Sequence, residues 1–366
     1  MASTGHLRDA APVARAPLSG LRVAYAPLSP SLEQPGDRRR FPWYARHRGL
    51  EFEIADPDQD YDVVVVSQRA DIVRWAQHGG RARLVYDLID AYLAGPAAAD
   101  WKSRGRGLAK FAIGEIARPV ANYRHAIEAM AARADAVVCS TREQRRDIER
   151  FAGNVHEVLD AHFELGDTIK STHRTGPVLN LLWEGQAENI PALEVVAEAL
   201  RGSDLAERTA VHLFTDLEYF RFLRRVGRRS SVKLGRALFP KVYFYEWNPY
   251  LFASVAAGCD MALVPIDLTT PLTAGKPENK LLLFWRLGLP ALVSASEAHR
   301  RVTREAGVDM ACVTAEDWRA ALQRYGPDAA AREEAAALGR RYVEEHHSEE
   351  QLLARWDRVF ESVLAR

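Results

Sequence analysis

The chain has 366 residues, of which 48% are apolar and 27% are charged. This balance is typical of globular proteins and excludes a largely disordered chain, and the length favours two domains. Lysine plus arginine and aspartate plus glutamate each number 49, so the net charge gives no reason to expect a nucleic-acid partner. The three cysteines are far apart, as expected for a protein of the reducing cytosol. No stretch approaches the roughly 18 apolar residues that a membrane-spanning helix needs.

Residues 1–19 are rich in alanine, proline and arginine and have no periodicity, which predicts a disordered lead. Short apolar runs and helical lengths then alternate. The runs typical of buried strands lie at 21–26, 61–67, 83–88, 134–140 and 155–159, and the helical patterns at 107–133, interrupted near Pro119, and at 141–151. Because parallel strands need such crossovers, this half predicts a parallel sheet.

The polar stretch 166–176 predicts a domain boundary, and a second series of units follows it. Strands are predicted at 177–183, 210–214, 241–245, 261–265, 291–294 and 311–313. Helices are predicted at 191–200, 250–257, 279–287, 296–306, 316–325, 328–345 and 348–364. The expected fold class is therefore α/β, with two tandem Rossmann-like, doubly wound domains that face a central cleft.

Several segments resemble those of GT-B glycosyltransferases, in the same order along the chain. Residues 259–265 are similar to the "aDvfvlPs" strand of these enzymes, and residues 276–293 to the "pnKlfEymalGlPvv" segment that follows it. Residues 134–143 resemble the "aDavivtSe" unit, and residues 178–185 the strand and glycine that open the second domain. The closing residues 342–356 resemble the terminal helices of the superfamily, which pack back onto the first domain.

The resemblance covers about residues 20–366 and implies a domain arrangement. It implies an acceptor domain over 20–170, a donor domain over 171–345 and a terminal helix over 346–366 that crosses back. It also implies transfer of a sugar from a nucleotide-sugar, which is a co-substrate, with no further cofactor and no metal site. Domain closure would then exclude water, which competes with the acceptor.

A group of polar residues near position 280 fits the chemistry of a nucleotide-sugar. The phosphate of the leaving group gains negative charge as the glycosidic bond breaks, and cations or helix N-terminal N–H groups stabilise that charge. Lys276, Asn279 and Lys280 stand at the predicted start of a helix, directly after a loop rich in Thr, Gly and Pro. The alternative is a surface loop with solvated lysines.

Two departures from the superfamily pattern indicate a divergent branch. Leu283 stands where many retaining GT-B enzymes have a glutamate that binds the donor ribose, and Glu278 is the candidate to replace that contact. The Arg and Lys that usually follow the opening glycine are also absent, since Gly185 is followed by Gln186. We nevertheless assign Gly185 and Gln186 to the donor site by the resemblance.

A second-domain strand is followed by residues suited to a nucleotide base. Trp247 is a candidate to stack on the base and Asn248 a candidate to contact its edge, with a core tryptophan as the alternative. In the first domain, Asp90 lies just past a strand, where a carboxylate could act as general base toward the acceptor hydroxyl. A helix cap or a turn is the alternative reading of Asp90.

The loop at 35–40 follows the first strand and is expected to face the cleft. Asp37, Arg38 and Arg39 are therefore candidates to bind the acceptor, and a solvated charged loop is the alternative.

Two basic segments suggest contact with an anionic membrane. Residues 221–241 contain eight cations interleaved with apolar residues, and residues 102–118 have a similar mixture. A solvated charged helix is the alternative for both. With the absence of a spanning segment, this predicts a cytoplasmic protein, in contact with the inner face of the membrane if these segments dock there.

The predicted function is that of a metal-independent glycosyltransferase, which moves a sugar to a glycan or a lipid-linked acceptor in bacterial surface polysaccharide synthesis. Acceptor class and pathway follow from the resemblance alone. Two rivals stay open: a sugar-nucleotide epimerase or hydrolase on the same fold, and a non-catalytic partner subunit with a degenerate donor site. The second rival is suggested by the two departures described above.

Overall fold

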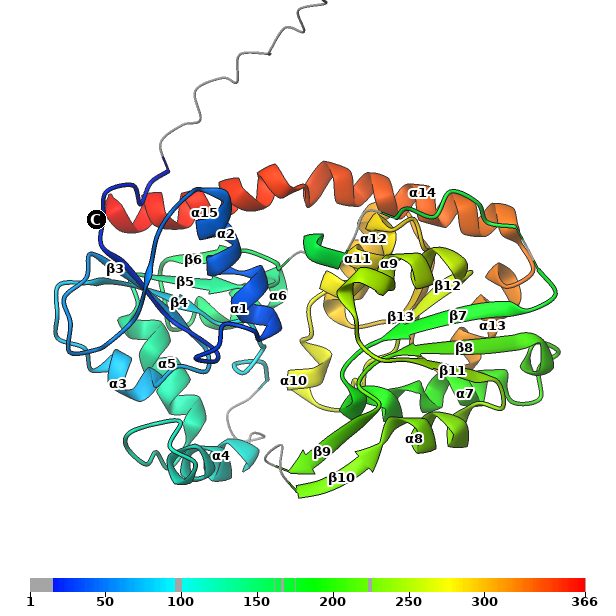
Figure 1. Cartoon of the computed structure of the whole chain (residues 1–366), viewed down its shortest axis with the longest axis horizontal. Coiled ribbons are helices and arrows are strands. Elements are labelled where there is room, and N and C mark those ends of the chain that lie inside the picture. The colour runs from blue at the N-terminus through cyan, green and yellow to red at the C-terminus, as the bar shows by residue number, and fades with distance from the viewer. Residues whose placement is uncertain are drawn as a thin grey trace, which may run out of the picture.

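The structure, a computed structural model, describes residues 16–95, 101–160, 162–165, 168–174, 176–222 and 226–365. Its centre consists of two parallel sheets of six strands each (Figure 1). The first unit contains the sheet β2-β1-β3-β4-β5-β6 and the second unit the sheet β11-β8-β7-β12-β13-β14. The predicted α/β class with two doubly wound units is therefore confirmed.

The first sheet is built from strands that are buried on both faces. Its strands are β1 (Val23–Ala26), β2 (Glu53–Ile54), β3 (Val63–Ser67), β4 (Arg83–Asp87), β5 (Ala136–Cys139) and β6 (Val155–Glu157). Alternate residues of β3 enter different cores: Val63 and Val65 pack in one cluster, Val64 and Val66 in the other. Because successive side chains of a strand point to opposite faces, an uninterrupted valine run suits this central position.

Helices cover both faces of this sheet. One face packs against α2 (Phe41–His47) and α15 (Glu349–Leu364), and the other against α3 (Ile72–Ala76), α5 (Tyr123–Arg133) and α6 (Arg142–Ile148). The short α1 (Pro35–Arg39) precedes α2, and α4 (Trp101–Ala112) precedes α5. The predicted interruption near Pro119 is confirmed, since α4 and α5 are separate helices.

The second sheet has one continuous core. Its strands are β7 (Leu179–Glu184), β8 (Thr209–Phe214), β11 (Val242–Tyr245), β12 (Met261–Val264), β13 (Ala291–Ser294) and β14 (Ala311–Cys312). The helices of this unit are η3 (Ala187–Leu193), α7 (Glu194–Leu200), α8 (Ser231–Leu238), α9 (Pro249–Gly258), α10 (Pro271–Ala274), α11 (Asn279–Arg286), α12 (Glu297–Ala306) and α13 (Ala315–Tyr325). The apolar run Leu281–Trp285 of α11 is buried, which fixes how the start of this helix faces the first unit.

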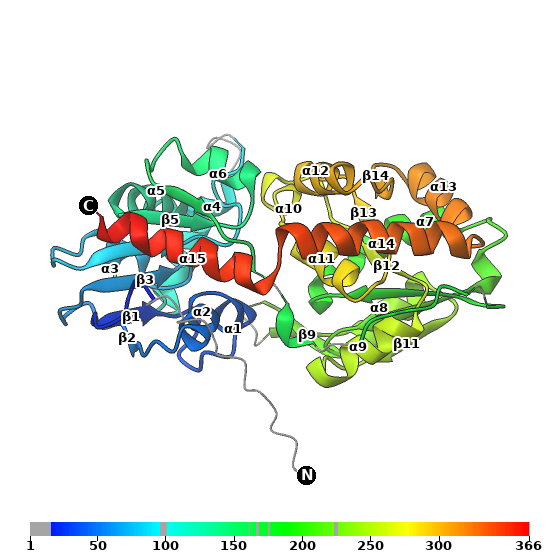
Figure 2. The same ribbon diagram turned by 90° about the horizontal axis from the view of Figure 1, so that it is seen from above.

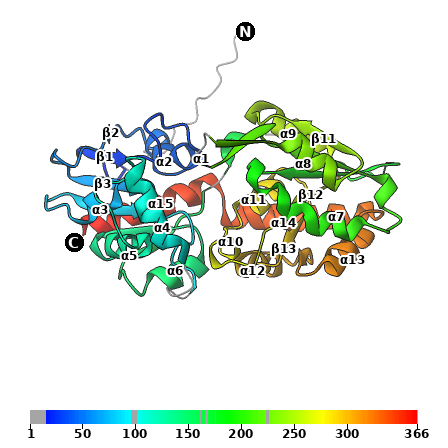
Figure 3. The same cartoon turned by 90° about the horizontal axis from the view of Figure 1, so that it is seen from below.

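The last two helices connect the units. Helix α14 (Ala329–His346) packs on α11 and α12 of the second unit, while α15 lies along the first unit (Figure 2). Ser348 and Gln351 form a capping box that starts α15 afresh after α14. Trp356 is fully buried against Phe41 and Phe360 in the core of the first unit. A helix at the end of the chain thus completes the core at its beginning. Figure 3 shows the two units side by side from below.

Three local expectations differ from the structure. Residues 35–39 form helix α1 rather than a loop, because Pro35 starts a helical turn and Asp37 is buried. The predicted charged helix around 221–241 is instead the antiparallel hairpin β9 (Glu218–Phe222) and β10 (Val226–Ser230), followed by α8. Residues 1–15 of the predicted lead lie outside the described residues, but Leu18 is only 1% exposed and packs in the core.

Within the described residues, no helix combines the length and the hydropathy that crossing a bilayer requires. The proposed limits of the two domains stay predictions; the boundary stretch 166–176 contains residues outside the described ranges.

Candidate functional site

Two lysines reach from the α10–α11 region toward the end of β7. Lys276 donates from Nζ to Oδ1 of Asn189 at 3.1 Å, and Lys280 donates from Nζ to the carbonyl of Glu184 at 2.9 Å. Lys280 also forms an ion pair with the Glu184 carboxylate at 3.0 Å. Both lysines are half-buried, so they form a cationic surface at the carboxyl end of the second sheet.

The two ammonium groups affect each other. Burial lowers the pKa of Lys276, and the positive charge of Lys280 lowers it further. The carboxylate of Asp90, in the first unit, works in the opposite direction. An anion placed between the two lysines would favour the charged form of both, which is the electrostatic requirement of a phosphate site.

Asp90 lies on the opposing side, just after β4. Its carboxylate accepts a hydrogen bond from Nε2 of Gln68 at 2.7 Å, and its backbone N–H donates to Oε1 of the same side chain at 2.8 Å. Gln68 itself is buried. The paired bonds fix the position of Asp90. Gln68 was not among the residues selected in the sequence analysis.

The loops that carry these residues touch each other. A Cβ atom on Gly275 would lie 2.5 Å from the Cβ of Ala91, and one on Gly95 would lie 2.9 Å from Cγ of Pro271. Both contacts join the loop after β4 to the segment after β12. The carboxyl ends of the two sheets therefore face one another, where ligands of open α/β sheets bind. We call this region the interdomain face.

Asn279 crosses the interdomain face. Its Nδ2 donates to Oδ1 of Asp160 at 3.0 Å, and its Oδ1 accepts from the backbone N–H of Lys280 at 2.9 Å. Asp160 follows β6 of the first unit and is buried. This contact ties the start of α11 to the first unit.

His162 lies in the middle of this region, surrounded by cations. Burial lowers its pKa well below the usual value, and Arg39 and Lys280 lower it further. Its Nε2 lies 3.2 Å from a terminal nitrogen of Arg39, which can only donate, so Nε2 accepts and Nδ1 carries the proton.

Trp247 lies beside the first unit. The guanidinium of Arg38 lies 5.4 Å from the centre of the Trp247 ring, a cation–π distance. Asn248 caps α9 by accepting the N–H of Tyr250 at 2.9 Å, so its side-chain oxygen is engaged in the helix.

Gly185 and Gln186 follow β7 directly. The carbonyl of Gly185 accepts from the hydroxyl of Thr215 at 2.7 Å, which fixes the turn. Gln186 is exposed and precedes η3, the helix that carries Asn189. The site thus gains Asn189, which the sequence analysis did not select.

Two of the predicted acceptor residues are buried and engaged by other groups of the first unit. Asp37 is completely buried and accepts from the hydroxyl of Tyr25 and the N–H of Leu28, each at 2.8 Å. The prediction that Asp37 binds the acceptor is therefore wrong. Arg39 is 8% exposed and forms an ion pair with Glu164, so only Arg38 keeps a half-exposed side chain at this face.

Glu278 also has a different role from the one predicted. It is 3% exposed, its carboxylate is paired with Arg301 at 2.8 Å, and Arg301 is paired in turn with Glu143 of the first unit at 2.8 Å. Burial raises the pKa of Glu278, while Arg301 opposes this shift. The prediction that Glu278 contacts the donor ribose is therefore wrong, because its buried carboxylate is held by Arg301.

Among the described residues, no group of three or more His, Cys, Asp or Glu side chains is arranged to hold a metal ion. The site residues that the sequence selected and that meet at the interdomain face are Asp90, Lys276, Asn279, Lys280, Trp247 and Arg38.

Comparison with solved protein structures identifies the fold of this chain. No family model matches the sequence, and no curated protein matches it. Solved structures match the fold with probability 1.00, and they are GT-B glycosyltransferases. The chain therefore has the GT-B fold, as the sequence resemblance predicted.

Three of these structures illustrate the likeness. HepE from Anabaena, solved with UDP and glucose, is 10% identical with a TM-score of 0.60, and the match covers 94% of this chain and 100% of HepE. TarM from S. aureus, solved with UDP, is 9% identical with a TM-score of 0.57; the match covers 81% of this chain and 55% of TarM. WaaG, a glycosyltransferase involved in lipopolysaccharide biosynthesis, is 16% identical with a TM-score of 0.50, over 82% of this chain and 78% of WaaG. The chain thus spans little more than half the length of TarM.

Proposed function

We propose that this protein transfers a sugar from a nucleotide-sugar to a glycan or lipid-linked acceptor. The observation that carries the proposal is the pair Lys276 and Lys280, which stand at the start of α11 opposite Asp90. UDP is the favoured nucleotide, because HepE and TarM were both solved with UDP.

The lysines would stabilise the leaving group. As the bond between sugar and diphosphate breaks, negative charge develops on the phosphate oxygens. Lys276 and Lys280, with the N-terminal N–H groups of α11, would receive this charge. The two ammonium groups offer cationic charge at the place where other transferases use a metal, so we propose a reaction that needs no metal ion. Activity should then persist in EDTA.

Asp90 would act on the acceptor. Its carboxylate is held by Gln68 and lies close enough to Lys276 to influence its pKa. A carboxylate in this position can take the proton of an acceptor hydroxyl as that oxygen attacks the sugar carbon. The half-exposed Arg38 at the same face would bind the acceptor.

We propose that the protein binds its acceptor at a membrane surface. Helix α4 and the segment after it expose Leu108, Phe111 and Ile113, which are 57%, 44% and 50% exposed. Arg228 and Arg229 of β10 and Lys233 of α8 are exposed as well, and α4 and the β9–β10 hairpin lie along the same side of the molecule in Figure 1. Exposed apolar and cationic side chains together favour anionic lipid, as expected for an enzyme of surface polysaccharide synthesis at the inner face.

Two other functions compete with this proposal. An epimerase or hydrolase would convert the nucleotide-sugar with no acceptor present. A non-catalytic subunit would bind no nucleotide. Leu283 stands where the usual ribose-binding glutamate would be, and this favours the subunit over the epimerase or hydrolase.

An assay of UDP-sugar turnover separates the three. The full chain is incubated with labelled UDP-sugars, with and without membrane extract as the source of acceptor. We expect UDP release that depends on the extract and is lost in Lys280→Ala. Release without extract would support the hydrolase; an altered sugar without UDP release would support the epimerase; no reaction and no UDP binding would support the subunit.

A further inference from the structure

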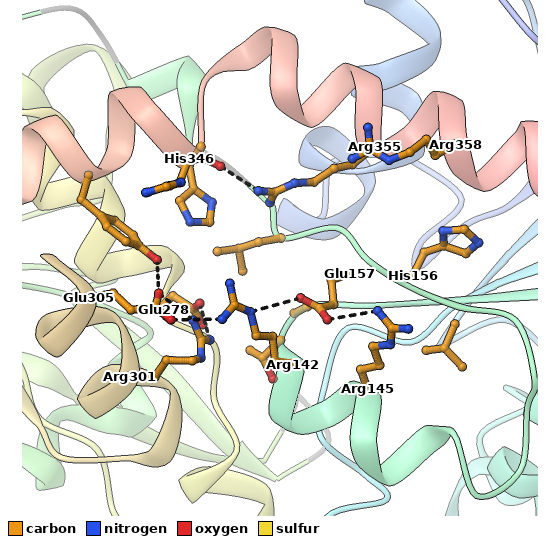
Figure 4. A pocket seen from close by; sticks show the side chains of 16 residues that line it. Arg142, Arg145, His156, Glu157, Glu278, Arg301, Glu305, His346, Arg355 and Arg358 are labelled. Atoms are coloured by element: carbon orange, nitrogen blue, oxygen red, sulfur yellow. Dashed lines mark hydrogen bonds and ion pairs between the residues drawn. The ribbon is translucent and has the colours of Figure 1, made fainter.

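A cavity lies where the two units and helix α15 meet, and neither Lys276 nor Lys280 is among the residues that line it. Its volume is about 620 Å³, which is within the range of small-molecule sites. Residues of α6 and β6 line it from the first unit, and residues of α12 and α14 from the second, while α15 closes it (Figure 4). The ion-paired Glu278 and Arg301 belong to its lining, whereas Asn279 does not.

Three of the five arginines of the cavity have carboxylate partners. Arg142 pairs with Glu305 at 3.0 Å, an ion pair that joins the two units. Arg145 lies 3.5 Å from Glu157, and Arg301 is held by Glu278 as described above. These carboxylates are therefore neutralised.

The other two arginines, Arg355 and Arg358, lie one turn apart on α15 and face the same cavity (Figure 4). Neither forms an ion pair with a carboxylate in the part of the chain that the structure describes. Arg355 donates to the carbonyl of His346 at 2.7 Å, a group that the break between α14 and α15 leaves open. Burial and the charge of Arg358 lower the pKa of Arg355, while the carboxylates of Glu157 and Glu278 oppose this shift.

Arg355 and Arg358 thus present two guanidinium groups, without a carboxylate partner among the described residues, beside polar walls. Two adjacent guanidinium groups match the oxygens of a phosphate group, to which arginine donates two parallel hydrogen bonds. The remaining lining is mainly polar and includes His156 and His347. Among the described residues that line the cavity, Val155 and Leu159 are the aliphatic ones. Such walls suit the hydroxyl groups of a sugar better than the flat apolar face of a nucleotide base.

We propose that this cavity binds a sugar phosphate, with the phosphate on Arg355 and Arg358 and the sugar toward Glu157. The site is distinct from the one proposed for the nucleotide-sugar. Because the ligand would contact α15 on the first unit and lie beside the Arg142–Glu305 pair that joins the units, we expect its binding to alter how the two units move relative to each other.

Calorimetric titration of the full chain tests the proposal. The probes are glucose 6-phosphate, inorganic phosphate and glucose, each titrated with and without saturating UDP. We expect glucose 6-phosphate to bind with one site, at least tenfold more tightly than inorganic phosphate, and glucose alone to show no binding. Glucose 6-phosphate should still bind when UDP is present. Absence of glucose 6-phosphate binding and absence of UDP binding are therefore separate outcomes.

Variants locate the site. Arg358→Gln removes an exposed side chain and should fold normally. We expect its affinity for glucose 6-phosphate to fall at least fivefold. The affinity of Arg355→Gln should fall at least tenfold. Arg341→Gln, on the exposed surface of α14, is the matched control and should bind as the unchanged chain does. The proposal is overturned if no phosphate probe binds, if UDP displaces glucose 6-phosphate, or if Arg358→Gln and Arg341→Gln bind equally well.

Discussion

The guanidinium of Arg38, in the first unit, lies 5.4 Å from the centre of the Trp247 ring, in the second. The contact places an aromatic face where the two units meet, close to the strand end at which the sequence predicted a base-binding residue. A nucleotide base that stacks on this face of Trp247 would replace Arg38.

Removal of the Trp247 ring should therefore weaken nucleotide binding. Stacking of a base on an aromatic side chain contributes about 1 to 3 kcal/mol, so Trp247→Ala should raise the Kd for UDP about tenfold in calorimetric titration. Tyr250→Ala is the control, since Tyr250 is 90% exposed on the neighbouring helix. An unchanged Kd in Trp247→Ala would remove Trp247 from the site.

Asp90→Asn should lower the rate of transfer and leave UDP binding unchanged. The amide keeps the hydrogen bonding to Gln68 possible but cannot accept a proton from the acceptor hydroxyl. General-base catalysis contributes about 100-fold or more, and we expect a loss of this order in kcat, measured as UDP release in the presence of acceptor. A variant with full kcat would show that Asp90 is a structural residue of the loop.

The Glu278–Arg301–Glu143 network should stabilise the fold. Arg301→Met leaves the buried carboxylate of Glu278 without its partner, which should lower the free energy of unfolding by about 3 kcal/mol in urea denaturation. Arg201→Met breaks an ion pair with Glu194 in which both side chains are more than half exposed, and it should cost less than about 1 kcal/mol. Equal losses in the two variants would contradict this account of Glu278.

Burial of His299 should make the fold sensitive to acid. Its pKa is lowered to about 4, chiefly by burial, while the unfolded chain has a pKa near 6.5. Between these values the unfolded state binds a proton that the folded state does not, so stability falls as the pH falls, by roughly 1 kcal/mol for each pH unit. Urea unfolding at pH 6.5, 5.5 and 4.5 measures this slope.

His299→Asn tests the assignment, because the asparagine amide can replace the Nδ1–H that faces the carbonyl of Ser294. The variant should lose less stability between pH 6.5 and 4.5 than the unchanged chain. The remaining loss comes from other histidines whose pKa burial lowers, namely His162, His173, His212 and His347. Parallel slopes would mean that His299 does not set the acid response.

Local patterns predicted the strands well because burial on both faces demands an uninterrupted apolar run, as in β3. They also selected Lys276 and Lys280, since the segment is contiguous and its residue types are chemically suggestive. Local patterns do not predict contacts between segments that are distant in the sequence. Arg301 meets Glu143 from 158 residues away, and this pairing turns Glu278 away from the lysines. The role of Asp37 was mispredicted for a different reason: its partners Tyr25 and Leu28 are near in sequence, but a charged segment after a strand does not reveal that the carboxylate is buried.

Titration of the full chain with UDP tests the central claim most directly. If Lys276 and Lys280 hold the diphosphate, Lys280→Ala should raise the Kd for UDP at least tenfold, since hydrogen bonds to charged groups contribute about 1.5 to 3 kcal/mol. Lys233→Ala, on the exposed face of α8, should not change it. No UDP binding by the folded chain, or equal Kd values for Lys280→Ala and Lys233→Ala, would contradict the account.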